Sequence, residues 1–187
     1  MHHLLIVACS TRPTRIGHSF ADWAMERARL DGRFEVELAD LRELDLPNFD
    51  EPHHPRLRRY EHAHTKRWSA IVSRADAIVF VTPEYNHGFP GALKNAIDFL
   101  HEEWKFKPAG FVSYGGIAAG TRAVQMMKPG LDCLRMIPSY EGVNIAYAQE
   151  AIVDGRFAAA KVHEDAATSM FNTLAFWAER NAPLYIR

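Results

Sequence analysis

The segment ADAIVFVTPEYNHGFPGALKNAIDFL, residues 75–100, contains a strand, a loop and a helix in succession. Ala75–Pro83 is a short continuous apolar run, which is typical of a strand buried on both faces. A helix is predicted over Ala92–Trp104, and two prolines and two glycines stiffen the loop between them (residues 83–91). The segment is therefore predicted to be one strand–loop–helix unit of an α/β protein.

The same alternation extends in both directions along the chain. Strands are also predicted at Leu4–Ala8, Phe34–Asp40, Ala109–Tyr114 and Val143–Ala148. Helices are also predicted at Ile16–Leu30, Tyr60–Arg74, Thr121–Met136 and Ala158–Arg180. Pro129 is expected to break or kink the third of these helices, and the stripe Val162, Ala166, Met170, Leu174 and Trp177 is expected to face the core from the last one. This alternation predicts a flavodoxin-like, doubly wound sheet of five parallel strands in the order 2-1-3-4-5, with helices on both faces.

Composition limits the classes of protein to which the chain can belong. Its 187 residues predict a single domain spanning residues 1–187, and 48% of them are apolar, enough for an ordinary core. The chain has 22 Lys and Arg against 23 Asp and Glu, without the basic excess of nucleic-acid-binding proteins. No apolar run approaches the roughly 18 residues of a membrane span. Two distant cysteines suggest a reducing compartment, and we expect a cytoplasmic protein with Cys9 and Cys133 buried as inert thiols.

The loop after the first predicted strand carries hydroxyl and guanidinium groups directly before a helix. It reads Cys9-Ser10-Thr11-Arg12-Pro13-Thr14-Arg15-Ile16-Gly17-His18-Ser19. Free N–H groups at a helix start, together with these side chains, favour a terminal phosphate. The loop matches neither G-x-x-x-x-G-K-[ST] nor G-x-G-x-x-G, which disfavours nucleoside triphosphates and the usual dinucleotide fold. The alternative is a capped turn with solvated arginines.

Two further loops offer surfaces for a flat ligand. Tyr85, Asn86 and Phe89 in the loop at 83–91 supply aromatic surface and an amide for a heterocycle edge. The loop at 113–122 is glycine-rich, so its backbone can approach a ring closely. Each loop could instead be an ordinary packed turn. Because loops after adjacent parallel strands meet at one crevice, the three together suggest a phosphate pocket beside a slot for a planar ring, as FMN requires.

These loops resemble those of the flavodoxin-like NAD(P)H-dependent FMN reductases. Ser10–Gly17 is similar to the family's G-S-T-R-P-x-R-x-G phosphate loop, and Pro83–Asp98 to its P-E-Y-N-x-x-x-P-x-x-L-K-N-A-I-D signature. Ser113-Tyr114-Gly115-Gly116 with Arg122-Ala123 resembles its S-Y-G-G-x-x-x-G-x-R-A element. The resemblance covers residues 4–148, with two departures: Cys9 replaces a usual glycine, and Ala119 stands where a second glycine pair is common.

The resemblance implies noncovalently bound FMN, NADH or NADPH as hydride donor, and assembly into homodimers or homotetramers. It places the phosphate at Ser10, Arg12, Arg15, Ile16, Gly17 and His18, and the isoalloxazine at Pro83, Glu84, Tyr85, Asn86, Gly88, Ser113, Gly115 and Gly116. Quinones, azo compounds, free flavins and metal oxyanions are the implied acceptors, reduced by ping-pong hydride transfer. Because the flavin performs the chemistry, no side chain is expected to be catalytic.

Two other functions remain open from the sequence. A flavodoxin-like electron carrier would be expected to be strongly acidic, which a net charge of −1 disfavours. A non-catalytic module that binds FMN or another phosphate ligand would keep the fold without turnover.

A stretch rich in histidine, arginine and proline, residues 52–67, is the one compositional oddity. Its histidines are His53, His54, His62 and His64, and its basic residues are Arg56, Arg58, Arg59, Lys66 and Arg67. The histidines suggest a metal site and the arginines a site for the 2′-phosphate of NADPH. A solvated loop and a solvated charged face are the interpretations that the sequence favours, and no metal is expected.

Overall fold

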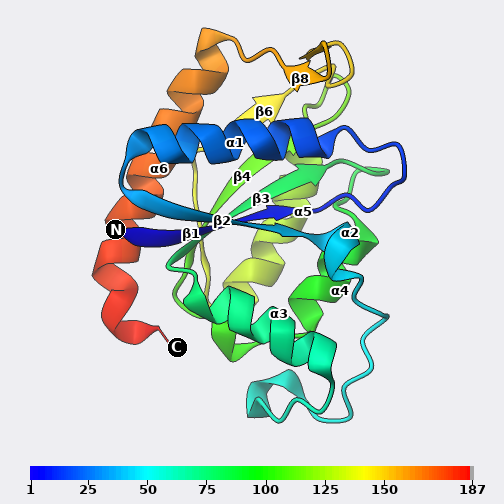
Figure 1. Cartoon of the computed structure of the whole chain (residues 1–187), viewed down its shortest axis with the longest axis vertical. Helices are drawn as coiled ribbons and strands as arrows, with labels where there is room; N and C mark the ends of the chain where they lie inside the picture. The colour runs from blue at the N-terminus through cyan, green and yellow to red at the C-terminus, as the bar shows by residue number, and fades with distance from the viewer. Residues whose placement is uncertain (186–187) are drawn as a thin grey trace.

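The computed structural model describes residues 1–185 and confirms the predicted sheet. Within these residues one six-stranded parallel sheet has the order β2 (Phe34–Asp40), β1 (His2–Ala8), β3 (Ala77–Pro83), β4 (Pro108–Tyr114) and β5 (Ile137–Pro138), with β6 (Val143–Ile145) also paired to β4. This is the doubly wound order predicted from the sequence (Figure 1). Because the strands are parallel, the loops that follow them leave at the same edge.

Side chains of the central strands alternate between two cores. Leu4 and Ile6 of β1 belong to the core beneath α1 (Gly17–Asp31) and α6 (Lys161–Asn181). Leu5 and Val7 belong to the core on the other face, which α3 (Ala63–Arg74), α4 (Gly91–Asp98) and α5 (Thr121–Cys133) cover. The strand reads as a continuous apolar run because helices cover both faces of the sheet.

Several helices end at other residues than predicted. The helix expected over Ala92–Trp104 is α4 only to Asp98; Phe99 and Leu100 are then buried, and Glu102–Trp104 forms a short 3-10 helix. The linker after β2 contains α2 (Leu41–Leu44) and the 3-10 turn Pro55–Leu57, and Ala182–Leu184 forms a third 3-10 turn after α6.

None of the helices in residues 1–185 is long and apolar enough to cross a membrane.

Two predictions about the helical surfaces are wrong. Helix α5 runs through Pro129 to Cys133, so the predicted break is wrong, and Met127 and Leu131 keep that stretch packed on the core although proline removes one backbone hydrogen bond. Cys133, expected in the core, is exposed.

The predicted apolar stripe of α6 is also partly wrong. Met170 and Leu174 are buried as predicted, but Val162 and Trp177 are exposed. The buried face instead includes Ala167, Phe171, Ala175 and Ala178.

The strand predicted over Val143–Ala148 is β6, which ends at Ile145, and the short β5 before it was not predicted. β5 pairs with the amino end of β4, and β6 pairs with Val112–Tyr114 at its carboxyl end. The chain bends away between them at residues 139–142, where a Cβ on Gly142 would lie 3.1 Å from the Phe111 carbonyl oxygen. Residues 146–148 are not part of the strand.

A small hairpin that the sequence analysis did not predict covers one end of α1. It joins β7 (Ile152–Val153) to β8 (Arg156–Phe157) through Asp154 and Gly155, which both have positive φ. The Phe157 ring lies 5.1 Å from the rings of both Phe20 and Trp23 on α1. The Asp-Gly pair was the available signal, but strands of two residues carry no periodicity.

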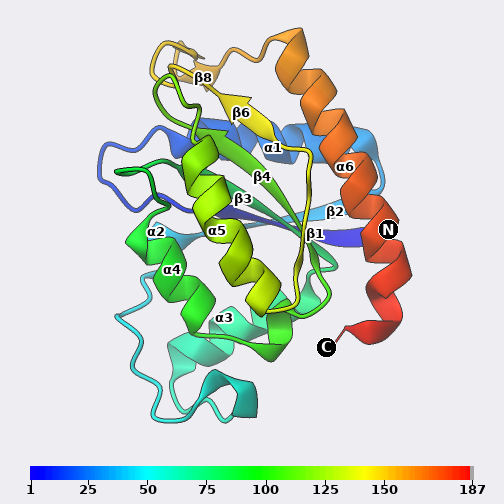
Figure 2. The ribbon, with the colours of Figure 1, turned by 180° about the vertical axis from the view of Figure 1, so that it is seen from behind.

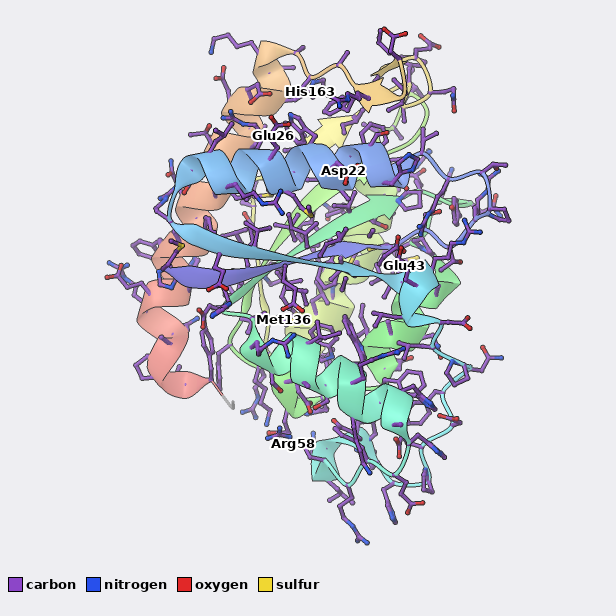
Figure 3. The ribbon with its side chains drawn as sticks, viewed as in Figure 1. Asp22, Glu26, Glu43, Arg58, Met136 and His163 are labelled. Carbon is purple, nitrogen blue, oxygen red and sulfur yellow. The ribbon has the colours of Figure 1, made fainter. Side chains whose placement is uncertain are left out.

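The histidine- and arginine-rich stretch is more ordered than a solvated loop. Glu51 accepts hydrogen bonds from the backbone N–H groups of Glu61 (2.8 Å) and His62 (3.1 Å) at the start of α3. The buried Glu103 accepts from Tyr60 and Ser69 and pairs with Arg58 at 3.3 Å. Arg58 lies on the far side of α3 from α1 (Figure 3). Within residues 1–185 no three His, Cys, Asp or Glu side chains are grouped so as to hold a metal.

The turn before α5 generates a prediction about stability. Gly120 has φ of +78°, and a Cβ there would lie 2.6 Å from the Tyr114 nitrogen. Gly120→Ala is expected to lower the free energy of unfolding by at least ~2 kcal/mol, because strain and a backbone clash combine. Gly116→Ala, where a Cβ meets nothing within 4 Å, is the control and should change it by less than ~0.5 kcal/mol. Denaturant unfolding of both variants checks this, and equal losses would contradict it.

The start of α6 generates a prediction about pH. The Ala160 N–H donates to His163 Nδ1 at 3.0 Å, and the His163 ring lies 5.1 Å from the Phe157 ring, above α1 in the view of Figure 3. Burial lowers the pKa of His163, although Glu164 opposes this. The stabilisation of the folded state by neutral His163 is therefore complete above the unfolded-state pKa of ~6.5 and is lost as the pH falls below it. From about pH 7 to pH 5, the Tm of the native protein should fall more than that of His163→Gln, which keeps an acceptor but does not titrate. Parallel Tm curves would contradict this.

Candidate functional site

Four loops at the carboxyl edge of the sheet surround one pocket of about 650 Å³. They follow β1, β3, β4 and β6 and lie on the same side of the molecule, opposite the N-terminus (Figure 2). The pocket is lined by Ser10, Arg12, Thr14, Arg15, Ile16, Pro83, Glu84, Tyr85, Tyr114, Gly115, Gly116, Tyr147, Ala148, Gln149 and Glu150. The three loops predicted to converge therefore do so, and a fourth joins them.

The first loop is held by an ion pair at its base. Arg15 forms a two-pronged pair with Asp40 at the end of β2, with Nη1 2.5 Å from Oδ1, and it also donates to the Ser10 carbonyl oxygen at 2.8 Å. Both side chains of the pair are nearly buried. Arg12 is exposed and lines the pocket. Arg15 thus fixes the shape of the loop, while Arg12 is the arginine that projects from it into solvent.

Helix α1 begins directly beneath this loop. The residue before it, Ile16, lines the pocket and has no side-chain cap, so the N–H groups of Gly17 and His18 at the start of the helix have no intrahelical partners. A Cβ on Gly17 would lie 2.3 Å from the Tyr114 hydroxyl oxygen. Glycine is therefore required for the helix to start so close to β4.

The second loop is a two-residue hairpin. Tyr85 and Gly88 exchange both backbone hydrogen bonds, at 2.8 and 2.9 Å. Asn86 and His87 at its tip have φ of 50° and 67° and are exposed. The Tyr85 hydroxyl is 2.7 Å from Ser10 Oγ, which ties this loop to the first.

An ion pair connects the second loop to α5. The Arg122 guanidinium donates to Glu84, with Nε 2.5 Å from Oε1. The Arg122 backbone N–H donates to the same carboxylate at 3.2 Å. Burial alone would raise the pKa of Glu84, but the hydrogen bonds and charge of Arg122 outweigh it and lower the pKa. Glu84 is consequently a carboxylate that contacts the first turn of α5, and it is not a proton donor at neutral pH.

The third loop turns tightly behind the pocket. Ser113 is buried and donates to the Ala119 carbonyl oxygen at 2.8 Å. The Gly115 N–H donates to Ile145, so Gly115 provides space and not a free donor. Ala119 adopts φ of 52°, a conformation that the glycine usual in the family would adopt more readily. The departure from the family pattern is accommodated as strain at that residue.

The fourth loop was not predicted as part of the site. Its residues 147–150 line the pocket, and Tyr147 has φ of 46°. The backbone N–H groups of Tyr147 and Ala148 donate to Gly116 (3.2 Å) and Gly115 (2.9 Å). The prediction of a strand over Val143–Ala148 hid this turn, because Tyr and Ala do not by themselves indicate a positive φ.

The predicted site residues divide into two groups. Those that line the pocket are Ser10, Arg12, Arg15, Ile16, Pro83, Glu84, Tyr85, Gly115 and Gly116. Those that belong to the same loops but do not line it are Gly17, His18, Asn86, Gly88 and Ser113. Gly17 and Ser113 still affect the shape of the pocket. Gly17 leaves room for the Tyr114 hydroxyl, and Ser113 donates a hydrogen bond to the Ala119 carbonyl oxygen.

The Cys9 thiol faces the core and not the pocket. It is fully buried, donates to the Val7 carbonyl oxygen at 3.2 Å, and burial raises its pKa well above the usual value. The prediction of an inert thiol is confirmed. Replacing the family's glycine by cysteine therefore does not crowd the phosphate loop.

Comparisons with known proteins agree with this geometry. Residues 2–150 match the family described as NADPH-dependent FMN reductase. An NAD(P)H-dependent FMN reductase of Schizosaccharomyces pombe is 36% identical over 155 residues, which cover 81% of this chain and 76% of that protein. A quinone reductase of Pseudomonas putida is 40% identical over 89 residues, covering 41% of this chain and 47% of that protein.

A solved structure supports the fold. FerB, a flavoenzyme NAD(P)H:(acceptor) oxidoreductase of Paracoccus denitrificans, superposes with a TM-score of 0.74 at 24% identity, covering 96% of this chain and 98% of that one. The family match spans most of the chain, and the Schizosaccharomyces pombe relative matches a similar share of it. The chain therefore belongs to the family of NADPH-dependent FMN reductases.

Proposed function

We propose that this protein uses noncovalently bound FMN to transfer hydride from NADH or NADPH to a quinone, an azo compound, a flavin or a similar small acceptor. Membership in the family makes it an oxidoreductase that depends on FMN and NAD(P)H. The assignment rests on one pocket. In it the loop after β1, with its hydroxyl and arginine side chains, meets the loops after β3 and β4, which both contain glycines. Its volume of about 650 Å³ lies within the ordinary range for cofactor sites.

The phosphate end of the pocket fits a dianion. Ser10, Arg12 and Ile16 line it, and Ile16 directly precedes α1, whose uncapped N–H groups and positive dipole end favour an anion. We assign phosphate binding to Ser10, Arg12 and the backbone of Ile16, Gly17 and His18. Arg15, already paired with Asp40, contributes charge and keeps the loop in place.

The opposite end fits a planar ring. Pro83 and Tyr85 line one side, and Gly115 and Gly116 line another where no side chain intervenes. Asn86 and Gly88 set the hairpin that carries Tyr85, and Ser113 sets the glycine loop. We assign these residues, with Glu84, to the isoalloxazine. When bound, FMN supplies the two-electron chemistry between nicotinamide and acceptor.

The protein's own part is positioning. Glu84 is held as a carboxylate by Arg122 and the Tyr114 phenol is buried, so neither serves as a general acid. Both substrates would use the one open slot in turn, which requires ping-pong kinetics. No side chain is assigned a catalytic role.

Three further features complete the proposal. We propose a homodimer or homotetramer as the active form and the cytoplasm as its location, on the basis of the family resemblance. The balanced charge of −1 favours an enzyme over an acidic electron carrier. Arg58 and Arg67 are already engaged with Glu103 and the Leu44 carbonyl oxygen, so the arginine-rich stretch is not assigned to the 2′-phosphate of NADPH.

Turnover by the purified protein tests the function. The FMN-loaded protein is expected to show a flavin spectrum and to oxidise NADH or NADPH continuously with a quinone or an azo dye present, giving parallel double-reciprocal lines as both substrates are varied. A protein that binds FMN but sustains no turnover would favour the electron carrier. A protein that binds no FMN would favour the non-catalytic module.

Arg12→Ala tests where the phosphate binds. Losing a charge-assisted hydrogen bond should raise the Kd for FMN roughly tenfold or more, with an unchanged Tm. Arg42→Ala is the matched control, because Arg42 is exposed, contacts the same loop through the Pro13 carbonyl oxygen (3.4 Å), and lines a separate cavity of about 370 Å³. Flavin fluorescence titration measures both. Equal Kd values for native protein and Arg12→Ala would refute the placement.

A further inference from the structure

Tyr147 is the exposed aromatic side chain of the pocket. Three tyrosines line it: Tyr85, Tyr114 and Tyr147. Tyr114 is 5% exposed and packs on Phe20, with ring centroids 4.7 Å apart. The Tyr85 hydroxyl is engaged by Ser10, whereas Tyr147 is 51% exposed. Tyr147 is therefore the ring with the most surface available to a bound molecule.

The backbone of Tyr147 is strained. Its φ of 46° is in the left-handed region, where a bulky side chain is an outlier. Asn or Gly would satisfy that conformation with less strain. Strain of this kind is concentrated at ligand-binding sites, where the surrounding structure enforces it.

Hydrogen bonds enforce the strained turn here. The Tyr147 N–H donates to the Gly116 carbonyl oxygen, and its own carbonyl oxygen accepts from the Glu150 N–H at 2.8 Å and from the Ala151 N–H at 3.3 Å. The neighbouring Ala148 N–H donates to Gly115. The turn is thus fixed to the glycine loop that we assign to the isoalloxazine, so the backbone from which the Tyr147 ring extends is held at the edge of the slot.

We propose that Tyr147 is a specificity-determining residue that selects planar aromatic electron acceptors by stacking against them in the slot. The inference rests on the proposed function. A small quinone has little besides its ring with which to bind, whereas a nicotinamide nucleotide is also held through its ribose and phosphates. Loss of one stacking surface should therefore affect the acceptor more than the hydride donor.

The test compares a planar with a non-planar acceptor on FMN-loaded protein. With 1,4-naphthoquinone, NADPH and one proton yield NADP⁺ and the hydroquinone. With ferricyanide, NADPH yields NADP⁺ and a proton while two Fe(III) centres are reduced. Tyr147→Asn removes the ring and suits a positive φ, Tyr147→Gly is a second variant of the same kind, and Tyr147→Phe keeps the ring.

Tyr147→Asn and Tyr147→Gly should raise the KM for naphthoquinone about fivefold to tenfold. Their KM for ferricyanide and Kd for FMN should stay within about twofold of the native values, and their Tm should be no more than about 2 °C below the native value, because both variants suit the positive φ. Tyr147→Phe should resemble the native protein. Parallel rises in KM for both acceptors, or a weaker Kd for FMN, would overturn the role of Tyr147 while leaving the proposed function intact. No turnover of native protein with any acceptor would overturn both.

Discussion

Parallel pairing of β1, β3 and β4 between two layers of helices is the constraint on which the rest of the structure depends. Burial of both faces requires uninterrupted apolar strands, since Leu4 and Leu5 enter opposite cores. This burial leaves the ends of the strands as the places where polar residues remain in water and lose no hydration. Because all three strands run the same way, the loops after Ala8, Pro83 and Tyr114 meet at one edge, and the pocket forms there.

The loops are held by bonds between loops more than by bonds within them. Arg15 joins the first loop to β2 through Asp40, Ser10 joins it to Tyr85, and Arg122 joins the second loop to α5 through Glu84. Ser10, Arg15, Asp40 and Glu84 are largely removed from water, where charge-assisted hydrogen bonds are stronger than on the surface, whereas Arg122 is half exposed. The pocket is therefore shaped before any ligand arrives, which reduces the entropy lost on binding.

Several residues with positive φ lie on the loops around the same pocket. Asn86, His87, Ala119 and Tyr147 are non-glycine residues with positive φ, and they lie on three of the four loops. Such conformations persist only where neighbouring hydrogen bonds compensate them, as between Tyr85 and Gly88 and between Tyr147 and Gly116. The geometry of the slot is consequently a property of the assembled edge and not of any single loop.

The sequence by itself determined the sheet order and the residues of three loops. Apolar runs such as Leu4–Ala8 show which strands are buried, and the motifs around Ser10 and Glu84 resemble a known family. The tertiary structure decided that Arg15 pairs with Asp40, that α5 passes through Pro129, and that residues 147–150 line the pocket instead of extending a strand. Local patterns record what each segment prefers in isolation. These three features depend on groups distant in sequence, whose packing and hydrogen bonds override that preference only when the chain is folded.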